Sequence, residues 1–502
     1  MPDKSSNIAG HNGPDSLRFM AIFAAVAPAM FLGAVDETIV ATALPVIAAR
    51  FSSFAHIAWV VTAYLLAATI AAPVYGRLGD AIGRKTALLG ALALFVAGSL
   101  ACALAPDFVT LVIARAIQGL GGGGLMTLAQ ALIGEAVSPR DRGRFQGWFS
   151  AIFVLAATIG PVLGGVLSEH VDWRCIFWIN LPLGLGATVA ALRIKAEPGE
   201  GGFKLDVPGA GLFIAATLAL LLALSLGSQV GWASPKILLL FGIGGIGLSL
   251  VLPLERRVRS PLLSPDLLVQ PVVWRSAICV LLFASALFAS VVQVPLLLQL
   301  LFHVSPSVSG LLLIPLTLAQ VAVSTWVGLR VSSTGLPKGP LVGGLAVATL
   351  GFAVLTATLS FGPLAVAFAS VVFGLGLGAT MPAAQTLAQW AGGKARLGAA
   401  TATLSFARSV GGVVGAALTT AILLGVLELA APGSTTRIQA LLSGASSAGS
   451  GGAMPDLTAL TDGFRWVFGA IAMMTFGATL LALTIPRVNL DDPEPEIATG
   501  RP

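Results

Sequence analysis

Long apolar runs recur along the whole chain and restrict the folds that it can adopt. A helix needs roughly 20 apolar residues to cross a hydrocarbon core of about 30 Å, and only helices and closed barrels satisfy their backbone polar groups there. These runs are too long and too continuous for barrel strands. We therefore predict an all-α polytopic membrane protein with fourteen transmembrane helices, at 19–45, 56–76, 86–105, 108–133, 145–167, 175–193, 208–227, 236–254, 274–302, 307–329, 339–359, 362–387, 399–428 and 463–485.

The composition and the charge pattern support this class. Of 502 residues, 56% are hydrophobic and 10% are charged, which is more apolar surface than soluble domains of ordinary size can bury. A pI of about 9.6 would favour nucleic-acid binding in a soluble protein. Here most Lys and Arg residues fall in alternate segments between the runs, so we expect no nucleic-acid partner and both termini in the cytoplasm. The three cysteines lie in or beside apolar runs and indicate neither a disulfide framework nor a metal site.

A degraded internal repeat indicates two halves. The segment Gly328 to Gly335 repeats the spacing of Gly76 to Gly83, and glycines near 411–415 echo those near 160–165. Transporters with repeated halves bind substrate near the midplane between them. We predict a cytoplasmic tail, an N-terminal six-helix bundle, two additional helices, a C-terminal six-helix bundle and a second cytoplasmic tail, at 1–18, 19–195, 196–260, 261–487 and 488–502.

Charged residues inside the runs are the first functional candidates. Asp36 and Glu37 lie in the first span, where a carboxylate costs about 2.5–3.5 kcal/mol at the helix centre and marks a pathway or a partner. Arg115 and Gln118 share one face of the fourth span, and a buried Arg stays charged. We predict a proton-coupling role for Asp36, Glu37 and Arg115. The alternatives are that one acid is permanently protonated or lies near the outer interface, and that Arg115 is a fixed interhelical clamp.

Other polar and aromatic residues in the spans are candidates to line a substrate cavity, together with Asp36. This set comprises Trp59, Tyr64, Gln118, Gln293, Gln320, Gln385 and Arg408. In the fifth span, Gly160, Pro161, Gly164 and Gly165 form a thin face with a proline that removes a helix hydrogen bond, so we consider it for gating. Gly121 to Gly124 has no following Lys-Ser/Thr, which disfavours an ATP-driven pump.

The most polar stretch inside the predicted bundles runs from Gly76 to Lys85. It is too short for a domain and too charged for hydrocarbon, so we expect a tight turn at the membrane surface. Asp80 has Arg77 and Arg84 as possible partners, and Arg84 and Lys85 are expected near water.

Taken together, these stretches resemble the major facilitator superfamily and, within it, the branch of fourteen-span drug:proton antiporters. Gly76, Asp80, Gly83, Arg84 and Lys85 match the loop signature between the second and third spans. Four more stretches resemble motifs of that branch, in chain order: 36–45 in the first span, 115–121 in the fourth, 160–165 in the fifth and 173–182 at the entry to the sixth.

The resemblance implies export of hydrophobic, often cationic, small molecules in exchange for protons, by alternating access of two rocking bundles. It implies Asp36 as the protonation or cation site, Arg115 as its relay and the Asp80 loop as a cytoplasmic gate. No enzyme activity, cofactor or metal is implied, because the proton gradient drives transport. We expect a monomer in the plasma (inner) membrane. A dedicated exporter of one metabolite, lipid or natural product is the alternative; a structural or sensory membrane protein is less compatible with paired buried charges.

Overall fold

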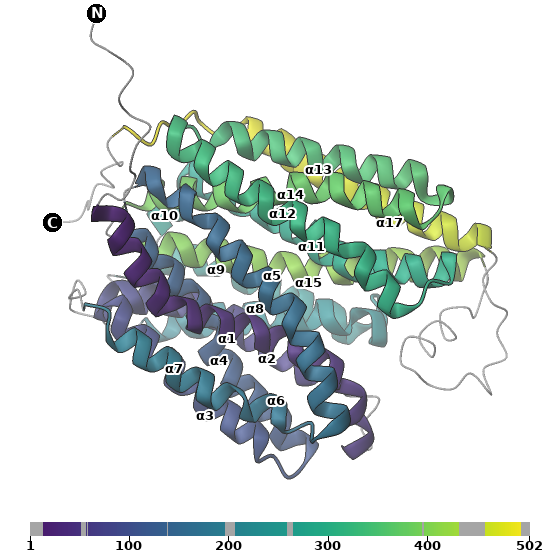
Figure 1. The fold of residues 1–502 in the computed structure, drawn as a ribbon, viewed down its shortest axis with the longest axis horizontal. Helices are drawn as coiled ribbons and strands as arrows, with labels where there is room; N and C mark the ends of the chain where they lie inside the picture. The colour runs from purple at the N-terminus through teal and green to yellow at the C-terminus, as the bar shows by residue number, and fades with distance from the viewer. Residues whose placement is uncertain are drawn as a thin grey trace, which may run out of the picture.

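The computed structural model describes residues 14–51, 57, 59–137, 139–195, 206–258, 265–393, 396–430 and 457–492. Most of these residues are helical (Figure 1). The elements are α1 (Pro14–Phe51), α2 (Trp59–Ile82), α3 (Arg84–Ala103), α4 (Phe108–Ala136), α5 (Pro139–His170), α6 (Cys175–Trp178), α7 (Asn180–Leu192), α8 (Val207–Val230), α9 (Pro235–Glu255), α10 (Pro265–Val269), α11 (Pro271–Phe302), α12 (Pro306–Thr334), α13 (Lys338–Thr358), η2 (Leu359–Phe361), α14 (Pro363–Gly392), α15 (Leu397–Ala430) and α17 (Leu457–Leu483).

Within the described residues, 13 segments are long and apolar enough to cross a membrane, and α6 and α7 together form one of them. They correspond to every predicted span except 145–167. That span lies within α5, a helix of 32 residues that is not one of the 13. The count of fourteen therefore stays a prediction, while the membrane-embedded helical architecture is shown.

The helices form two bundles, seen in Figure 1 as a purple-to-blue group and a green-to-yellow group. The fifth long helix of each bundle packs against the second long helix of the other, α5 against α12 and α15 against α2. Helix α8 packs on both α2 and α15, and α9 packs on α8. The start of α1 and the end of α17 lie at the same end of the molecule (Figure 1), as expected for an even number of spans.

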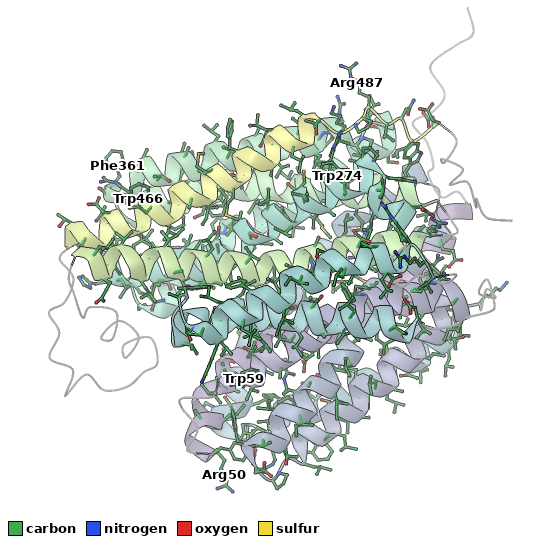
Figure 2. The ribbon with its side chains drawn as sticks, turned by 180° about the vertical axis from the view of Figure 1, so that it is seen from behind. Arg50, Trp59, Trp274, Phe361, Trp466 and Arg487 are labelled. Carbon is green, nitrogen blue, oxygen red and sulfur yellow. The ribbon has the colours of Figure 1, made fainter. Side chains whose placement is uncertain are left out.

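The bundle surface is apolar. Phe361 is 77% exposed and Trp466 is 66% exposed, and both side chains point away from the helices at one edge of the molecule (Figure 2). A soluble protein rarely exposes such residues over a continuous surface, whereas a bilayer solvates them. The exposed side chains are therefore the lipid-facing surface of the fold.

Glycines determine how closely the helices approach one another. A Cβ at Gly160 or Gly164 of α5 would collide with atoms of Thr38 or Ile39 in α1. In the second bundle, a Cβ at Gly411 or Gly415 of α15 would collide with the backbone of α11. The fifth long helix thus contacts the first through small residues in both bundles, which is the common way to bring membrane helices close together.

The stretch from Gly76 to Lys85 differs from the prediction. Helix α2 continues to Ile82 and α3 begins at Arg84, so only Gly83, with φ 92°, separates them. The expected end of the second span at residue 76 is wrong. The expectation that Arg84 stays near water is also wrong, because its side chain is 7% exposed and bonded to two carboxylates. These ion pairs neutralise the charges of Asp80 and Arg84, so α2 can continue through this polar stretch.

Helix α4 begins at a well-defined cap. The carboxylate of Asp107 accepts hydrogen bonds from the backbone N–H of Thr110 at 2.9 Å and from its hydroxyl at 2.8 Å. These two bonds lower the pKa of the Asp107 carboxyl below its usual value. The cap satisfies one of the free N–H groups in the first turn of the helix that carries Arg115.

Candidate functional site

A buried carboxylate network joins helices α1, α4 and α7 (residues Asp36, Arg115, Gln118 and Asn180). Asp36 is 0% exposed and Arg115 is 1% exposed. The Nη1 of Arg115 donates to Oδ2 of Asp36 at 2.7 Å. The side-chain amides of Gln118 and Asn180 donate to Oδ1 of Asp36 at 2.9 and 2.8 Å. Both oxygens of the carboxylate therefore have charged or amide donors.

Further hydrogen bonds extend this network to α2 and α3, while the side-chain oxygen of Asn180 has no hydrogen-bond partner in the structure. The Nε of Arg115 donates to the carbonyl oxygen of Val60 at 3.0 Å, and Asn180 donates to the hydroxyl of Ser99 at 3.0 Å. The Arg115 guanidinium lies over the ring of Tyr64, 4.3 Å from its centroid. Such a ring contributes favourably to holding a desolvated cation.

Local sequence brings these groups together. Arg115 and Gln118 are three residues apart on α4, so both face α1, and Nη1 of Arg115 also donates to Oε1 of Gln118 at 2.7 Å. Gly98 on α3 has no side chain where the backbone of Gln118 passes, and this lets α3 and α4 pack closely beside the network.

Three donors point at the two oxygens of Asp36, and one of them is the guanidinium of Arg115. A buried ion pair is costly to break by removal of one partner, at about 3–5 kcal/mol. Separation of Asp36 from Arg115 therefore requires that α1 and α4 move relative to each other, or that another group takes over Arg115.

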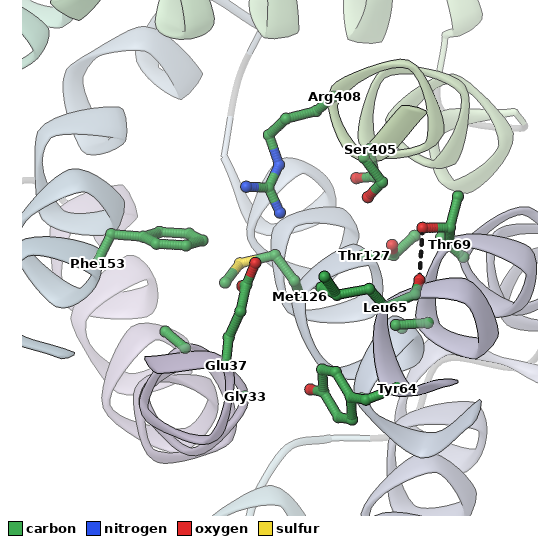
Figure 3. Close-up of a pocket in the computed structure, with 16 residues that line it drawn as sticks. Gly33, Glu37, Tyr64, Leu65, Thr69, Met126, Thr127, Phe153, Ser405 and Arg408 are labelled. Carbon is green, nitrogen blue, oxygen red and sulfur yellow. Dashed lines mark hydrogen bonds between the residues drawn. The ribbon is translucent and has the colours of Figure 1, made fainter. Parts of the chain in front are cut away.

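Two cavities lie between the bundles next to this network. The first has a volume of about 70 Å³ and is lined by Glu37 and Tyr64 from one bundle and by Ser405 and Arg408 from the other. In Figure 3 the guanidinium of Arg408 and the carboxyl of Glu37 point toward each other across this cavity. Arg408 also lies over the ring of Phe153, 5.3 Å from its centroid. The cavity therefore presents one acid and one cation from opposite bundles.

The second cavity, of about 330 Å³, shares Glu37 and Arg408 with the first. Its lining includes Thr62 in the first turn of α2, so it extends toward the end of α2 opposite to Asp80. Leu224 and Ser225 of α8 also line it. One of the two additional helices thus contributes to a space between the bundles.

The structure separates the predicted site residues into three groups. Tyr64 and Arg408, predicted for substrate binding, line the first cavity, and so does Glu37, which was predicted only for proton coupling. Asp36, Arg115 and Gln118 belong to the buried network and line neither cavity. Four further candidates also line neither cavity: Trp59, Gln293, Gln320 and Gln385.

The four candidates that line neither cavity have other surroundings. Trp59 packs at the start of α2 against a small apolar cluster. The amide of Gln293 donates to Thr419 at 3.3 Å between α11 and α15. The backbone of Gln320 lies where a Cβ on Gly378 would collide, and Gln385 is fully buried in α14.

At the other end of α2, Asp80 connects the two bundles. Its Oδ1 and Oδ2 accept from the backbone N–H groups of Gly398 and Ala399, each at 3.1 Å. These N–H groups lie in the first turn of α15, where a helix leaves donors free and carries positive potential. We call this arrangement the latch: Asp80 with the first turn of α15.

Neighbouring residues of the predicted gate complete the latch. Arg84 pairs with Asp80 at 2.9 Å and with Glu135 of α4 at 2.6 Å. A Cβ at Gly76 would collide with Ala402 of α15. Lys85 donates instead to the carbonyl oxygen of Leu192 at 2.8 Å, at the end of α7. The bundles are therefore in direct backbone contact at this end.

Of the fifth-span residues predicted for gating, Gly160 and Gly164 contact α1 directly beside the buried network, as described above. Gly165 has open space where a Cβ would lie. Pro161 lies within α5, but its side chain is outside the described part. The close face therefore consists of Gly160 and Gly164.

Sequence reasoning missed two members of the network. Asn180 interrupts an apolar run, and this isolated amide was the available signal. Ser99 gave no signal, because a serine in a membrane helix usually bonds to its own backbone. Here its hydroxyl donates to the carbonyl oxygen of Phe177 at 3.0 Å and accepts from Asn180.

A membrane protein with two packed bundles, a cavity between them and buried charges beside that cavity has the architecture of a secondary transporter. The chain belongs to the Major Facilitator Superfamily, whose family model matches residues 26–416. It is a transporter and not an enzyme.

The relatives include bacterial and fungal transporters. The chain is 33% identical over 398 residues to the multidrug transporter protein MdtP of Bacillus subtilis, covering 79% of this chain and 73% of that protein. It is 33% identical over 399 residues to the efflux pump dotC of Dothistroma septosporum, covering 78% and 69%. It is 35% identical over 412 residues to an uncharacterized MFS-type transporter of Mycobacterium tuberculosis, covering 81% of this chain and 60% of that protein.

Solved structures support the fold. The proton:xylose symporter XylE, bound to 6-bromo-6-deoxy-D-glucose, superposes with a TM-score of 0.65 at 13% identity, covering 95% of this chain and 98% of that one. The human organic anion transporter MFSD10 gives a TM-score of 0.57 at 14% identity, covering 94% and 100%. At this identity the likeness shows the fold alone.

Proposed function

We propose that this protein exports hydrophobic small molecules, often cationic, in exchange for protons, by alternating access between its two bundles. The observation that carries the proposal is the buried network of Asp36 and Arg115 directly behind a cavity that both bundles line. The names of the relatives, multidrug transporter and efflux pump, support the direction and the substrate class.

In the proposed cycle, Asp36 and Glu37 have different tasks. Asp36 takes and releases the coupling proton. Arg115 keeps the Asp36 carboxylate ionised until the bundles rearrange. Glu37 faces the cavity opposite Arg408 and offers its carboxylate to a substrate cation. Tyr64 lines the cavity and stacks on Arg115, so substrate that displaces this ring also disturbs the ion pair.

The energetics permit this exchange. One pH unit corresponds to about 1.36 kcal/mol per proton, and one charge crossing 100 mV to about 2.3 kcal/mol. One or two protons therefore sustain a substantial substrate gradient without ATP or another cofactor. The protein acts as a monomer in the plasma (inner) membrane, with both termini and the latch on the cytoplasmic side.

The test is transport in vesicles with an imposed pH gradient, using a panel of lipophilic monocations, dications and neutral compounds. We expect gradient-driven transport of several compounds by the native protein and none by Asp36→Asn. Asp462→Asn is the matched control, because Asp462 also pairs with an arginine, at 3.1 Å, but is 59% exposed. Unchanged gradient-driven transport by Asp36→Asn contradicts the coupling role. Transport of only one compound supports a dedicated exporter instead.

A second variant controls for loss of transport through misfolding. Asp36→Asn leaves Arg115 buried without a carboxylate, which costs about 3–5 kcal/mol. The double variant Asp36→Asn/Arg115→Gln removes both charges and relieves that cost. A double variant that folds as stably as the native protein and still lacks proton-driven transport supports coupling through this pair.

A further inference from the structure

A groove on the lipid-facing surface of the second bundle is larger than either central cavity. It lies between α12 and α13, over α14, and has a volume of about 590 Å³. Both α12 and α13 pack on α14, and Figure 1 shows these three helices together in the upper bundle. Its lining consists mainly of apolar residues and glycines, among them Val323, Trp326, Gly339, Gly343, Val347 and Leu375.

Two glycines of α13 keep the groove open. Gly339 and Gly343 are four residues apart and face it together, and each has no atom within 4 Å of the place where a Cβ would lie. This differs from Gly344, whose Cβ would collide with Ala379 of α14. Gly344 therefore allows helix packing, whereas Gly339 and Gly343 leave a space that the protein itself does not fill.

One end of the groove is cationic. Arg330 and Thr334, in the last turns of α12, are its polar lining residues. Among the described residues no carboxylate lies within ion-pair distance of Arg330. The groove therefore combines an apolar wall with a cation at one end, and the described part of the chain supplies no carboxylate to pair with that cation.

The length of the groove fits one leaflet of a bilayer. The lining residues of α12 run from 323 to 334, which is about 16 Å at 1.5 Å per residue. Half of a hydrocarbon core of about 30 Å is about 15 Å. An acyl chain lying along Trp326 would therefore place its headgroup near Arg330.

We propose that this groove binds one anionic phospholipid, with an acyl chain against Trp326, Gly339 and Gly343 and the headgroup phosphate paired with Arg330. The occupant is a lipid because the groove opens on a surface whose exposed side chains, Trp326 at 61% and Leu336 at 51%, are apolar. It is anionic because Arg330 is the charged residue that lines the groove, and an anionic headgroup complements it. The site is separate from the central cavities and from the latch.

The test is native mass spectrometry of the purified full chain, titrated with phosphatidylglycerol or with phosphatidylcholine of the same acyl chains. We expect one phosphatidylglycerol to bind about fivefold more tightly than phosphatidylcholine, the effect of one basic side chain on an anionic lipid. Arg330→Gln should abolish this preference. Gly343→Leu should weaken binding of both lipids, because its side chain would enter the groove from a position where a Cβ has open space.

The matched control is Gly477→Leu on α17, another exposed helical glycine with no atom within 4 Å of its Cβ position. It should leave the binding of both lipids unchanged, and thermal unfolding in detergent should show that all three variants remain folded. Equal affinity of the native protein for the two lipids overturns the anionic preference. Unchanged binding by Gly343→Leu overturns the groove as the site.

Discussion

Asp36 and Glu37 are adjacent on α1, yet their side chains have different surroundings. Residues next to each other on a helix point about 100° apart, so Asp36 faces Arg115 inside the first bundle while Glu37 faces Arg408 across the cavity. Asp36 has three donors in a buried network, whereas Glu37 lines the cavity between the bundles. In the mechanism that we propose, one helix thereby couples a proton site to a binding site without a shared side chain.

Replacing Glu37 by Gln should therefore affect cations selectively. A hydrogen bond to a charged group contributes about 1.5–3 kcal/mol, so we expect KM for lipophilic monocations to rise about 10- to 100-fold. KM for neutral substrates should stay within about twofold, and the pH gradient should still drive their transport. Uptake measured at several substrate concentrations distinguishes these cases. An equal rise of KM for neutral and cationic compounds would show that Glu37 has only a structural role.

At the scale of the helices, the existence of spans could be predicted far better than their rotation. Hydropathy along α1 is high on every side, so it does not reveal which of Asp36 and Glu37 faces the cavity. The same holds for Arg115, whose need for a partner was evident but whose partner lies 79 residues earlier in the chain. The extension of α2 through Asp80 could not be predicted either, because it depends on Arg84, Glu135 and the first turn of α15.

Adjacent glycines in α5 provide a test of the contact between α5 and α1. Gly164→Ala should destabilise the protein and reduce transport, because its Cβ would collide with the carbonyl oxygen of Ile39 and push α1 away beside Asp36. Gly165→Ala should leave the thermal unfolding temperature unchanged or raise it, since its Cβ position is open and alanine favours a helix by about 1 kcal/mol over glycine. Thermal unfolding in detergent and gradient-driven uptake measure both effects. Similar destabilisation by the two variants would mean that α5 does not approach α1 through this face.

At the scale of the whole molecule, the two bundles are held differently at their two ends. At the Asp80 end, the latch joins α2 to the first turn of α15. Toward the other end of α2, a cavity of about 330 Å³ lies between the bundles. In the second bundle, the segment Gly328 to Gly335 repeats the spacing of Gly76 to Gly83 and ends at Gly335, with φ 68°. Ser332 and Ser333 lie in the part of this segment that corresponds to Asp80. We therefore expect a single acid, Asp80, to bias which end is closed.

Asp80→Asn should shift the bundles toward the state that is open at the Asp80 end. Carboxylate bonds to a helix N-terminus contribute about 1–2 kcal/mol, so the ratio of the two states should change about 5- to 30-fold. Glu135→Gln is the matched control, because it also removes a carboxylate from Arg84 but leaves the two bonds between Asp80 and α15 in place. Spin labels on Thr86 and Ser333, both exposed at this end, report the distance between the bundles by electron double resonance, in a background without the native cysteines. We expect a longer distance to gain population in Asp80→Asn and not in Glu135→Gln, together with slower turnover at unchanged substrate affinity. If both variants give the native distance distribution, the bond between Asp80 and α15 does not set the conformational equilibrium.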